Sequence, residues 1–193
     1  MGERRFNPEN AHRLDSEERR VSSPPDDVLA HLPLDPGMAV ADIGAGTGFF
    51  ARPIAHRIRP GRVYAVDIQP EMLAVLQEKL SSAREFDNVL PSIGDAQATG
   101  LSTESIDLAF LANLWHELDD LGAVLTEARR ILRASGTLAI LDWSPSASSP
   151  PGPPADHRIP ESVVCNTLVD HKWDIVSTHS LWQTHYLVIA RAI

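Results

Sequence analysis

Cysteine is almost absent from this 193-residue sequence, which contains only Cys165. A lone cysteine cannot form an internal disulfide, and it supplies too few thiolates for a zinc site. The eight histidines are scattered, and neither the His-x-Glu nor the His-Glu-x-x-His spacing occurs. We therefore expect no metal and a protein suited to a reducing compartment.

Long apolar runs are also missing. No segment reaches the length of a transmembrane helix, and residues 1–5 lack the apolar core of a secretory signal. These absences predict a cytoplasmic protein with no membrane partner.

Positive charge is scarce, with 17 Lys and Arg against 26 Asp and Glu and a formal net charge of -9. Because a general grip on nucleic acid needs clustered cations, no nucleic-acid partner is expected. The densest basic group alternates with Glu17 and Glu18, which favours the solvated face of an amphipathic helix. The group consists of Arg4, Arg5, Arg13, Arg19 and Arg20.

Between residues 38 and 143, short β-rich runs alternate with helical stretches. This alternation predicts an α/β fold in which helices wrap a parallel sheet. Strands are expected at 38–43, 62–68, 89–93, 106–111 and 137–143, the last after a turn at Ser135-Gly136. Helices are expected at 49–58, from Pro70 onward and at 121–132, and a further helix at 160–169 precedes two strands at 174–182 and 184–190.

The organisation predicted for residues 1–193 is one domain with four parts. A helical cap (1–35) precedes a cofactor-binding core (36–143), a Pro/Ser-rich loop (144–159) and a C-terminal helix with a strand pair (160–193). The stretch 144–154 is almost entirely Ser, Pro, Ala and Gly, which favours a flexible surface linker. A loop over a pocket remains the alternative, because the stretch directly follows a central strand.

The first strand runs into the segment Asp42-Ile43-Gly44-Ala45-Gly46-Thr47-Gly48. Ligands of open α/β sheets bind at this position, and glycines let the backbone turn sharply and approach a ligand. A dinucleotide fingerprint is spaced G-x-G-x-x-G, whereas these glycines fall at every second position. The preceding Asp42 disfavours a pyrophosphate and suits an ammonium group, so the segment favours S-adenosylmethionine over NAD.

A second acid, Asp67, ends the second strand. A carboxylate there can accept hydrogen bonds from both ribose hydroxyls. Capping of the helix that begins near Pro70 is the structural alternative. NAD enzymes place an acid at the same position, so Asp67 indicates a nucleoside without choosing between the two cofactors.

These motifs resemble the class I S-adenosylmethionine-dependent methyltransferases, in the methyltransferase-domain group related to ubiquinone/menaquinone biosynthesis enzymes. The resemblance rests on residues 40–48, 66–68, 94–96, 111–118 and 131–138. It implies a Rossmann-like, doubly wound, mostly parallel seven-stranded sheet with an antiparallel C-terminal strand pair. It also implies a set of residues that bind the S-adenosylmethionine cofactor: Asp42, Gly44, Ala45, Gly46, Gly48, Asp67, Ile68, Asp95, Ala96 and Asn113.

Catalytic candidates are histidines, because methyl transfer needs a base only when the acceptor must lose a proton. His116 follows the fourth strand, and a packed histidine at a helix start is an equal alternative. His157 lies just after the proline-rich loop. For His185, packing or solvent exposure is favoured over a place in the site. Trp115, Trp143 and Asp142, at the ends of the fourth and fifth strands, are candidates for the wall of an acceptor pocket, with core packing favoured.

The acceptor is expected to be a small molecule. The Asn/Asp-Pro-Pro-Tyr motif of nucleic-acid amino methyltransferases is missing, since residues 113–116 read Asn-Leu-Trp-His, and arsenite methyltransferases need several cysteines. Two other functions stay open: an S-adenosylmethionine-binding protein without transferase activity and a nucleotide-dependent oxidoreductase on a similar fold. A monomer or a homodimer is expected.

Overall fold

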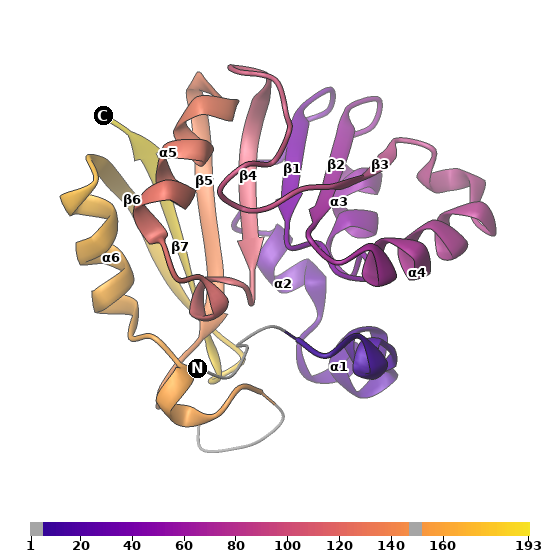
Figure 1. Cartoon of the computed structure of the whole chain (residues 1–193), viewed down its shortest axis with the longest axis horizontal. Helices are drawn as coiled ribbons and strands as arrows, with labels where there is room; N and C mark the ends of the chain where they lie inside the picture. The colour runs from indigo at the N-terminus through magenta and orange to yellow at the C-terminus, as the bar shows by residue number, and fades with distance from the viewer. Residues whose placement is uncertain (1–5, 147–151) are drawn as a thin grey trace.

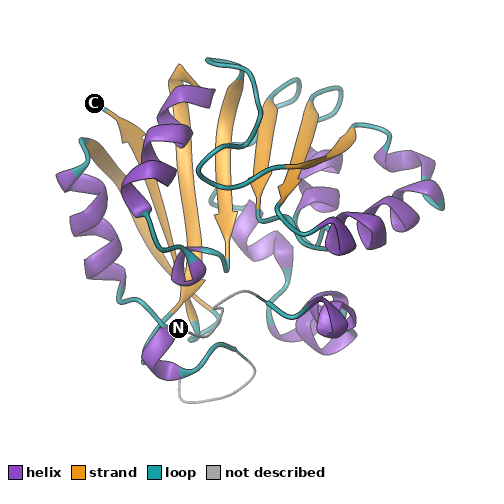
Figure 2. Ribbon diagram, in the orientation of Figure 1, coloured by secondary structure: helices purple, strands orange, loops and turns teal. Residues whose placement is uncertain are grey.

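A seven-stranded sheet in the order β3-β2-β1-β4-β5-β7-β6 forms the centre of the molecule (Figures 1 and 2). This computed structural model describes residues 6–146 and 152–193, apart from the side chain of residue 84. The strands β1 to β5 pair in parallel, whereas β7 is antiparallel to both β5 and β6. The predicted fold class is confirmed. The strands are β1 Ala39–Ile43, β2 Arg62–Asp67, β3 Val89–Ile93, β4 Ile106–Ala112, β5 Leu132–Trp143, β6 Trp173–Leu181 and β7 His185–Ala192.

Helices cover both faces of the sheet and form two separate apolar cores. Side chains of α2, α3 and α4 belong to one core, and those of α5 and α6 belong to the other. The helices are η1 Pro8–Asp15, α1 Glu17–Ser22, α2 Pro25–Leu29, α3 Ala51–Arg57, α4 Pro70–Ser81, η2 Arg84–Phe86, η3 Trp115–Glu117, α5 Leu121–Ile131, η4 Ala155–His157 and α6 Glu161–Asp170, where η marks a 3-10 helix.

The predicted turn at Ser135-Gly136 is wrong in form. Strand β5 already begins at Leu132, and its register with β4 passes from Ile106↔Leu132 to Leu108↔Thr137. Residues 133–136 are therefore a bulge within the strand, because β5 advances further than β4 over this interval. The ion pair between Arg133 and Asp107, at 2.6 Å, ties the bulge to β4.

Among the N-terminal arginines, Arg13 is exposed as predicted, but Arg19 does not lie on a solvated face. Helix α1 has only six residues and is capped by the Ser16 hydroxyl, which accepts from the amide of Arg19. The Arg19 guanidinium lies 4.0 Å from the centre of the Phe49 ring and donates to the carbonyl of Leu14 at 2.7 Å. This short helix turns Arg19 inward onto the segment that follows the glycine loop. Arg4 and Arg5 lie outside the described residues.

The described ends of the proline-rich stretch are attached to the protein body, and residues 147–151 lie outside the described residues. The amide of Ser144 donates to the carbonyl of Thr184 at 2.8 Å. At the other end, a Cβ added to Gly152 would lie 3.0 Å from ring atoms of Trp143, so the backbone packs closely on the indole. A freely flexible linker does not describe these two ends.

Helix α5 fixes the loop between β3 and β4 through a buried carboxylate. Glu127 is 6% exposed and accepts from both the amide (2.8 Å) and the hydroxyl (2.6 Å) of Thr99. Arg130 donates to the same carboxylate at 2.7 and 2.8 Å. These contacts, led by Arg130, lower the pKa of Glu127 to about 2.

Replacing Glu127 with alanine should lower the free energy of unfolding at pH 7 by about 2–4 kcal/mol, because the buried donors of Thr99 lose their acceptor. Urea unfolding of the variant measures the loss, and Glu78→Gln on an exposed position of α4 is the control. Because the pKa of Glu127 in the folded protein lies below its ordinary value of 4.5, the carboxylate stabilises the fold fully above about pH 5 and loses this contribution as the pH falls toward 2. The difference in unfolding free energy between wild type and variant should therefore narrow over this range. A constant difference would contradict this account.

Candidate active site

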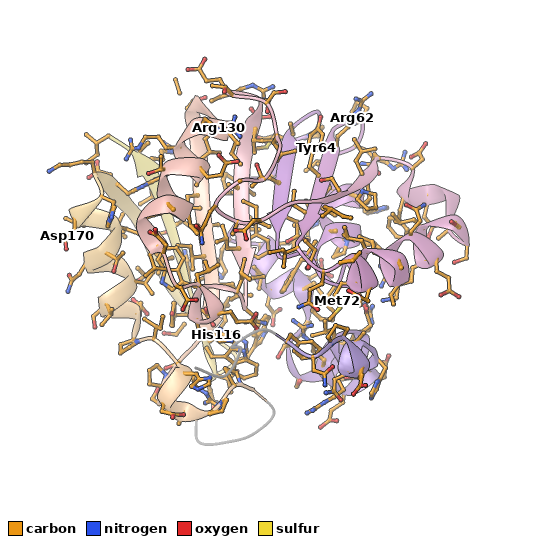
Figure 3. The ribbon with its side chains drawn as sticks, viewed as in Figure 1. Arg62, Tyr64, Met72, His116, Arg130 and Asp170 are labelled. Carbon is orange, nitrogen blue, oxygen red and sulfur yellow. The ribbon has the colours of Figure 1, made fainter. Side chains whose placement is uncertain are left out.

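The candidate site lies at the carboxyl edge of the parallel strands, where ligands of open α/β sheets bind. Figure 3 shows His116 and Met72 toward this edge, whereas Arg62 and Arg130 lie toward the opposite one. Loops that follow β1, β2, β3 and β4 carry the predicted cofactor residues. The sequence therefore places them on one side of the sheet.

The glycine loop after β1 has a backbone that other residues rarely adopt. Gly44, Gly46 and Gly48 have φ values of +75°, +53° and +81°. The amides of Gly44 and Ala45 donate to the carbonyl of Val66 at 2.8 and 3.0 Å, which attaches the loop to β2. At Gly48 an added Cβ would lie 2.5 Å from the side chain of Leu76, so a larger residue at this position would collide with α4 unless Leu76 moved.

Asp67, at the end of β2, joins the glycine loop to helix α4. Its carboxylate accepts from the amide of Gly46 at 2.7 Å and from the amide of Gln69 at 2.9 Å. Burial raises the pKa of Asp67, and these amides oppose the rise. The backbone amide of Ile68 also bonds to this carboxylate. A carboxylate has about four acceptor positions, so these amides do not use them all.

Two buried oxygen atoms beside the loop lack a hydrogen-bond donor among the described residues. They are Oδ2 of Asp42 and Oδ1 of Asn113. Asn113 has a φ of +56°, and its backbone N–H donates to the carbonyl of Leu141 at 2.8 Å. Buried acceptors without donors are costly, and these two fit a ligand that brings N–H groups to the glycine loop.

Asp42 is 2% exposed. Burial, followed by the charge of Asp67, raises the pKa of Asp42 to about 7, while the amide of Ala51 and the charge of Arg19 oppose the rise. The ligand-free site therefore holds two adjacent carboxylates, and the charge of one makes ionisation of the other less favourable.

The segment after β3 lies next to Asp67. The amide of Gly94 donates to the carbonyl of Asp67 at 3.1 Å, and the carboxylate of Asp95 accepts from the amide of Gln97 at 2.9 Å. Ala96 is buried, whereas Ile68 exposes 37% of its surface, which is unusual for an isoleucine beside a buried acid. These residues leave an apolar and hydrogen-bonding surface beyond Asp67, the acid predicted to bind the ribose.

His116 forms a pair with Asp142 that the sequence analysis did not predict. Nδ1 of His116 lies 2.8 Å from Oδ1 of Asp142, and the backbone amide of His116 donates to Oδ2 at 2.9 Å. Burial lowers the pKa of His116, but the hydrogen bond and charge of Asp142 outweigh it, so the pKa is raised. With Nδ1 occupied, Nε2 is the ring nitrogen left for a substrate.

Glu117 is the only described acid within ion-pair distance of the other ring nitrogen, with Oε1 3.8 Å from Nε2 of His116. Burial raises the pKa of Glu117 to about 7, and the charge of His116 opposes the rise. The amide of Phe6 also bonds to this carboxylate. The N-terminal segment therefore reaches the predicted catalytic histidine.

The other candidate residues lie in packed surroundings. His185 is buried, with its ring 4.0 Å from that of Trp143 and its Nδ1 2.8 Å from the Thr184 hydroxyl. Burial is the main cause that lowers the pKa of His185 to about 3, so it is neutral. Trp115 is fully buried in the core. His157 lies half-buried in η4, and within the described residues its ring has no hydrogen bond or ion pair.

The described residues contain neither a helix that could span a membrane nor a cluster of metal ligands. No helix in residues 6–146 and 152–193 is both long and apolar enough to cross a bilayer. Over the same ranges, no three His, Cys, Asp or Glu side chains are grouped so that they could hold a metal ion.

Comparison with known proteins identifies the family. The methyltransferase domain family matches residues 41–140, which is more than half of the chain. The chain belongs to this family. It is a class I S-adenosylmethionine-dependent methyltransferase domain, and S-adenosylmethionine is its cofactor. These matches favour the methyl donor over NAD and give the oxidoreductase alternative no support.

A solved S-adenosylmethionine-dependent methyltransferase from Aquifex aeolicus is 28% identical, with a TM-score of 0.91 over 98% of this chain and 100% of that one. An uncharacterized methyltransferase of Mycobacterium tuberculosis is 34% identical over 66% of this chain and 48% of its own length. The ubiquinone/menaquinone biosynthesis C-methyltransferase of Bordetella avium is 33% identical over 56% of this chain and 42% of its own. The chain spans less than half the length of these two curated relatives.

Two residues near the site were missed for different reasons. The sequence predicts Asp142 only as a candidate for a pocket wall, because its pairing with His116 follows from the adjacency of β4 and β5. It predicts a solvated Arg19, because alternation with acids is typical of an exposed helix. Strand order carried the signal for Asp142, and no sequence pattern indicated Arg19.

The pH dependence of stability should reveal the buried acid at position 42. Since the folded-state pKa of Asp42 is about 7 against an ordinary 3.8, the folded protein holds a proton that the unfolded chain has released. Stability should fall as the pH rises from 4 to 7.

In Asp42→Asn this fall should shrink by at least about 1 kcal/mol, since one pKa unit corresponds to about 1.4 kcal/mol. Urea unfolding of the ligand-free protein at pH 5 and pH 8 measures it. The same fall in wild type and variant would show that Asp42 ionises normally.

Proposed function

We propose that this protein transfers the methyl group of S-adenosylmethionine to a small-molecule acceptor. One observation carries the proposal: the buried oxygens of Asp42 and Asn113 lack donors beside a glycine loop attached to Asp67. S-adenosylmethionine supplies an electrophilic methyl group on a sulfonium. The roles of this chain are to align the acceptor with that methyl group and to exclude water.

The proposed donor site divides between two parts of the ligand. Asp42 and Asn113, with the glycine loop formed by Gly44, Ala45, Gly46 and Gly48, face the amino-acid end. Asp67 accepts from the ribose hydroxyls, while Ile68, Asp95 and Ala96 surround the adenine. The free acceptor positions on Asp67 and the exposed side chain of Ile68 support this division.

Asp67→Ala should weaken binding of S-adenosylhomocysteine by more than tenfold, because hydrogen bonds to a charged group contribute about 1.5–3 kcal/mol. Adenosine should lose affinity by a similar factor, since it carries the same ribose. Isothermal titration calorimetry compares both ligands, with Asp174→Asn on an exposed position of β6 as control. An unchanged dissociation constant would refute the role given to Asp67.

His116 is proposed as the group that takes a proton from the acceptor. Its Nε2 makes no hydrogen bond among the described residues, with the Glu117 carboxylate 3.8 Å away, and Asp142 both orients the ring and stabilises its charged form. When the acceptor atom bears a proton, that proton moves to Nε2 as the new bond to carbon forms and the sulfur keeps the electron pair. His157 is the weaker candidate, because no described contact connects it to this pair.

Asp142→Asn should lower the pKa of His116, because the variant keeps the shape of the carboxylate but removes the charge that favours imidazolium. NMR titration of the histidine Hε1 signals in wild type and variant measures the shift. His171, on the surface beyond α6, should titrate alike in both proteins and serves as the internal control. An unchanged pKa of His116 in the variant would contradict the proposal that the charge of Asp142 stabilises imidazolium.

We further propose the setting in which the protein works. A lone cysteine and an acidic charge balance support a cytoplasmic enzyme that acts on small molecules rather than on nucleic acid. The parts around the core, 1–35 and 144–193, are proposed to shape the acceptor side within one domain. A monomer or a homodimer fits this arrangement.

A further inference from the structure

Arg19 is a half-buried cation with no ion pair in the described structure. Its Nη1 donates to the carbonyl of Leu14, and its guanidinium lies on the ring of Phe49, the residue after the glycine loop. Burial lowers the pKa of Arg19 to about 10, which leaves it fully protonated at neutral pH. A desolvated positive charge without a carboxylate partner is costly, and it indicates a place for an anion.

The acids near Arg19 do not meet this need. Asp15 already binds Arg20 at 3.0 Å and Arg52 at 3.1 Å, and it also accepts from Lys79 and from the Thr47 hydroxyl. Asp42, the other acid that Arg19 influences, holds its proton up to about pH 7. The positive charge of Arg19 beside the glycine loop is therefore not balanced by either acid.

Asp42, whose Oδ2 lacks a donor, is one of the charges that act on Arg19, and Asn113, whose Oδ1 also lacks a donor, follows β4, the strand beside β1. An anion next to Arg19 and N–H donors next to these oxygens are the two ends of an α-amino acid. We propose that Arg19 binds the carboxylate of the methionine part of the donor, while Asp42 and Asn113 bind its ammonium group. This inference rests on the proposed function, because it assigns a further residue to the same ligand.

The N-terminal segment then contributes to the donor site as well as to the acceptor side. Leu14 lies against Gly46, where an added Cβ would be 3.3 Å from its Cδ1. The carbonyl of Phe6 accepts from the side chain of Gln69 at 3.1 Å, two residues after the ribose-binding acid. A bound carboxylate would hold Arg19 in place, and with it the segment from Phe6 to Ser22 that covers the loop.

The test compares two ligands that differ in the amino-acid end: S-adenosylhomocysteine, which has it, and 5′-deoxy-5′-methylthioadenosine, which lacks it. Calorimetry measures both dissociation constants for wild type, Arg19→Gln, Arg19→Lys and the exposed control Arg13→Gln. In Arg19→Gln, S-adenosylhomocysteine should bind more than tenfold more weakly, whereas methylthioadenosine should bind within twofold of wild type. Arg19→Lys should recover part of the loss, and Arg13→Gln should change neither constant.

Equal weakening of both ligands in Arg19→Gln would overturn the inference, because it would mean that the loop rather than one contact was damaged. Unchanged binding of S-adenosylhomocysteine would overturn it as well. If Arg19→Gln does not fold, wild type decides the matter with decarboxylated S-adenosylhomocysteine, which should bind more than tenfold more weakly than the parent. A wild-type protein that binds no adenosyl ligand would refute the proposed function itself, and the inference with it.

Discussion

Two carboxylates, Asp42 and Asp67, are buried at the ends of adjacent parallel strands, and the rest of the site depends on how they are held. The register of β1 on β2 brings them together, because Ile43 pairs with Val66. Backbone amides from the glycine loop and from α4 solvate Asp67, so this acid tolerates burial. Asp42 is left with an oxygen that lacks a donor and with a raised pKa. The unpaired, buried carboxyl group of Asp42 thus destabilises the ligand-free fold, and a bound cationic group would relieve this destabilisation.

Most of the fold could be predicted because its signals are local. Alternating apolar runs, glycines and helix-starting prolines mark β1 to β4 and helices α3 to α5 without reference to distant residues. The bulge at 133–136 could not be predicted, since it depends on how β5 meets β4. Strand β7 likewise extends to Ala192, beyond the predicted end at residue 190, because Arg191 pairs with both β5 and β6 and Ala192 pairs with β6.

The candidate site divides along the same line. Glycine spacing and strand-end acids are local patterns, so candidate residues for binding the donor could be proposed from the sequence. The proposed catalytic pair could be predicted only in half: His116 follows β4, but Asp142 ends β5, and only the sheet order makes them neighbours. From the sequence alone, a histidine at this position is equally well explained as a catalytic base or as a packed side chain. A histidine fixed by a fully buried acid has a defined tautomer and leaves Nε2 facing away from that acid.

The N-terminal segment shows how sequence patterns fail at a ligand site. Arginines that alternate with acids normally lie in solvent, since burial of a cation without a partner is unfavourable. Here Asp15 forms ion pairs with Arg20, Arg52 and Lys79 and so attaches the segment to the protein body. This attachment places Arg19 against the ring of Phe49. If Arg19 binds the carboxylate of the donor as we propose, its partner belongs to the ligand and is not encoded in the chain. A residue whose position is unfavourable for the protein alone is therefore the kind that sequence reasoning misses and that structure reveals.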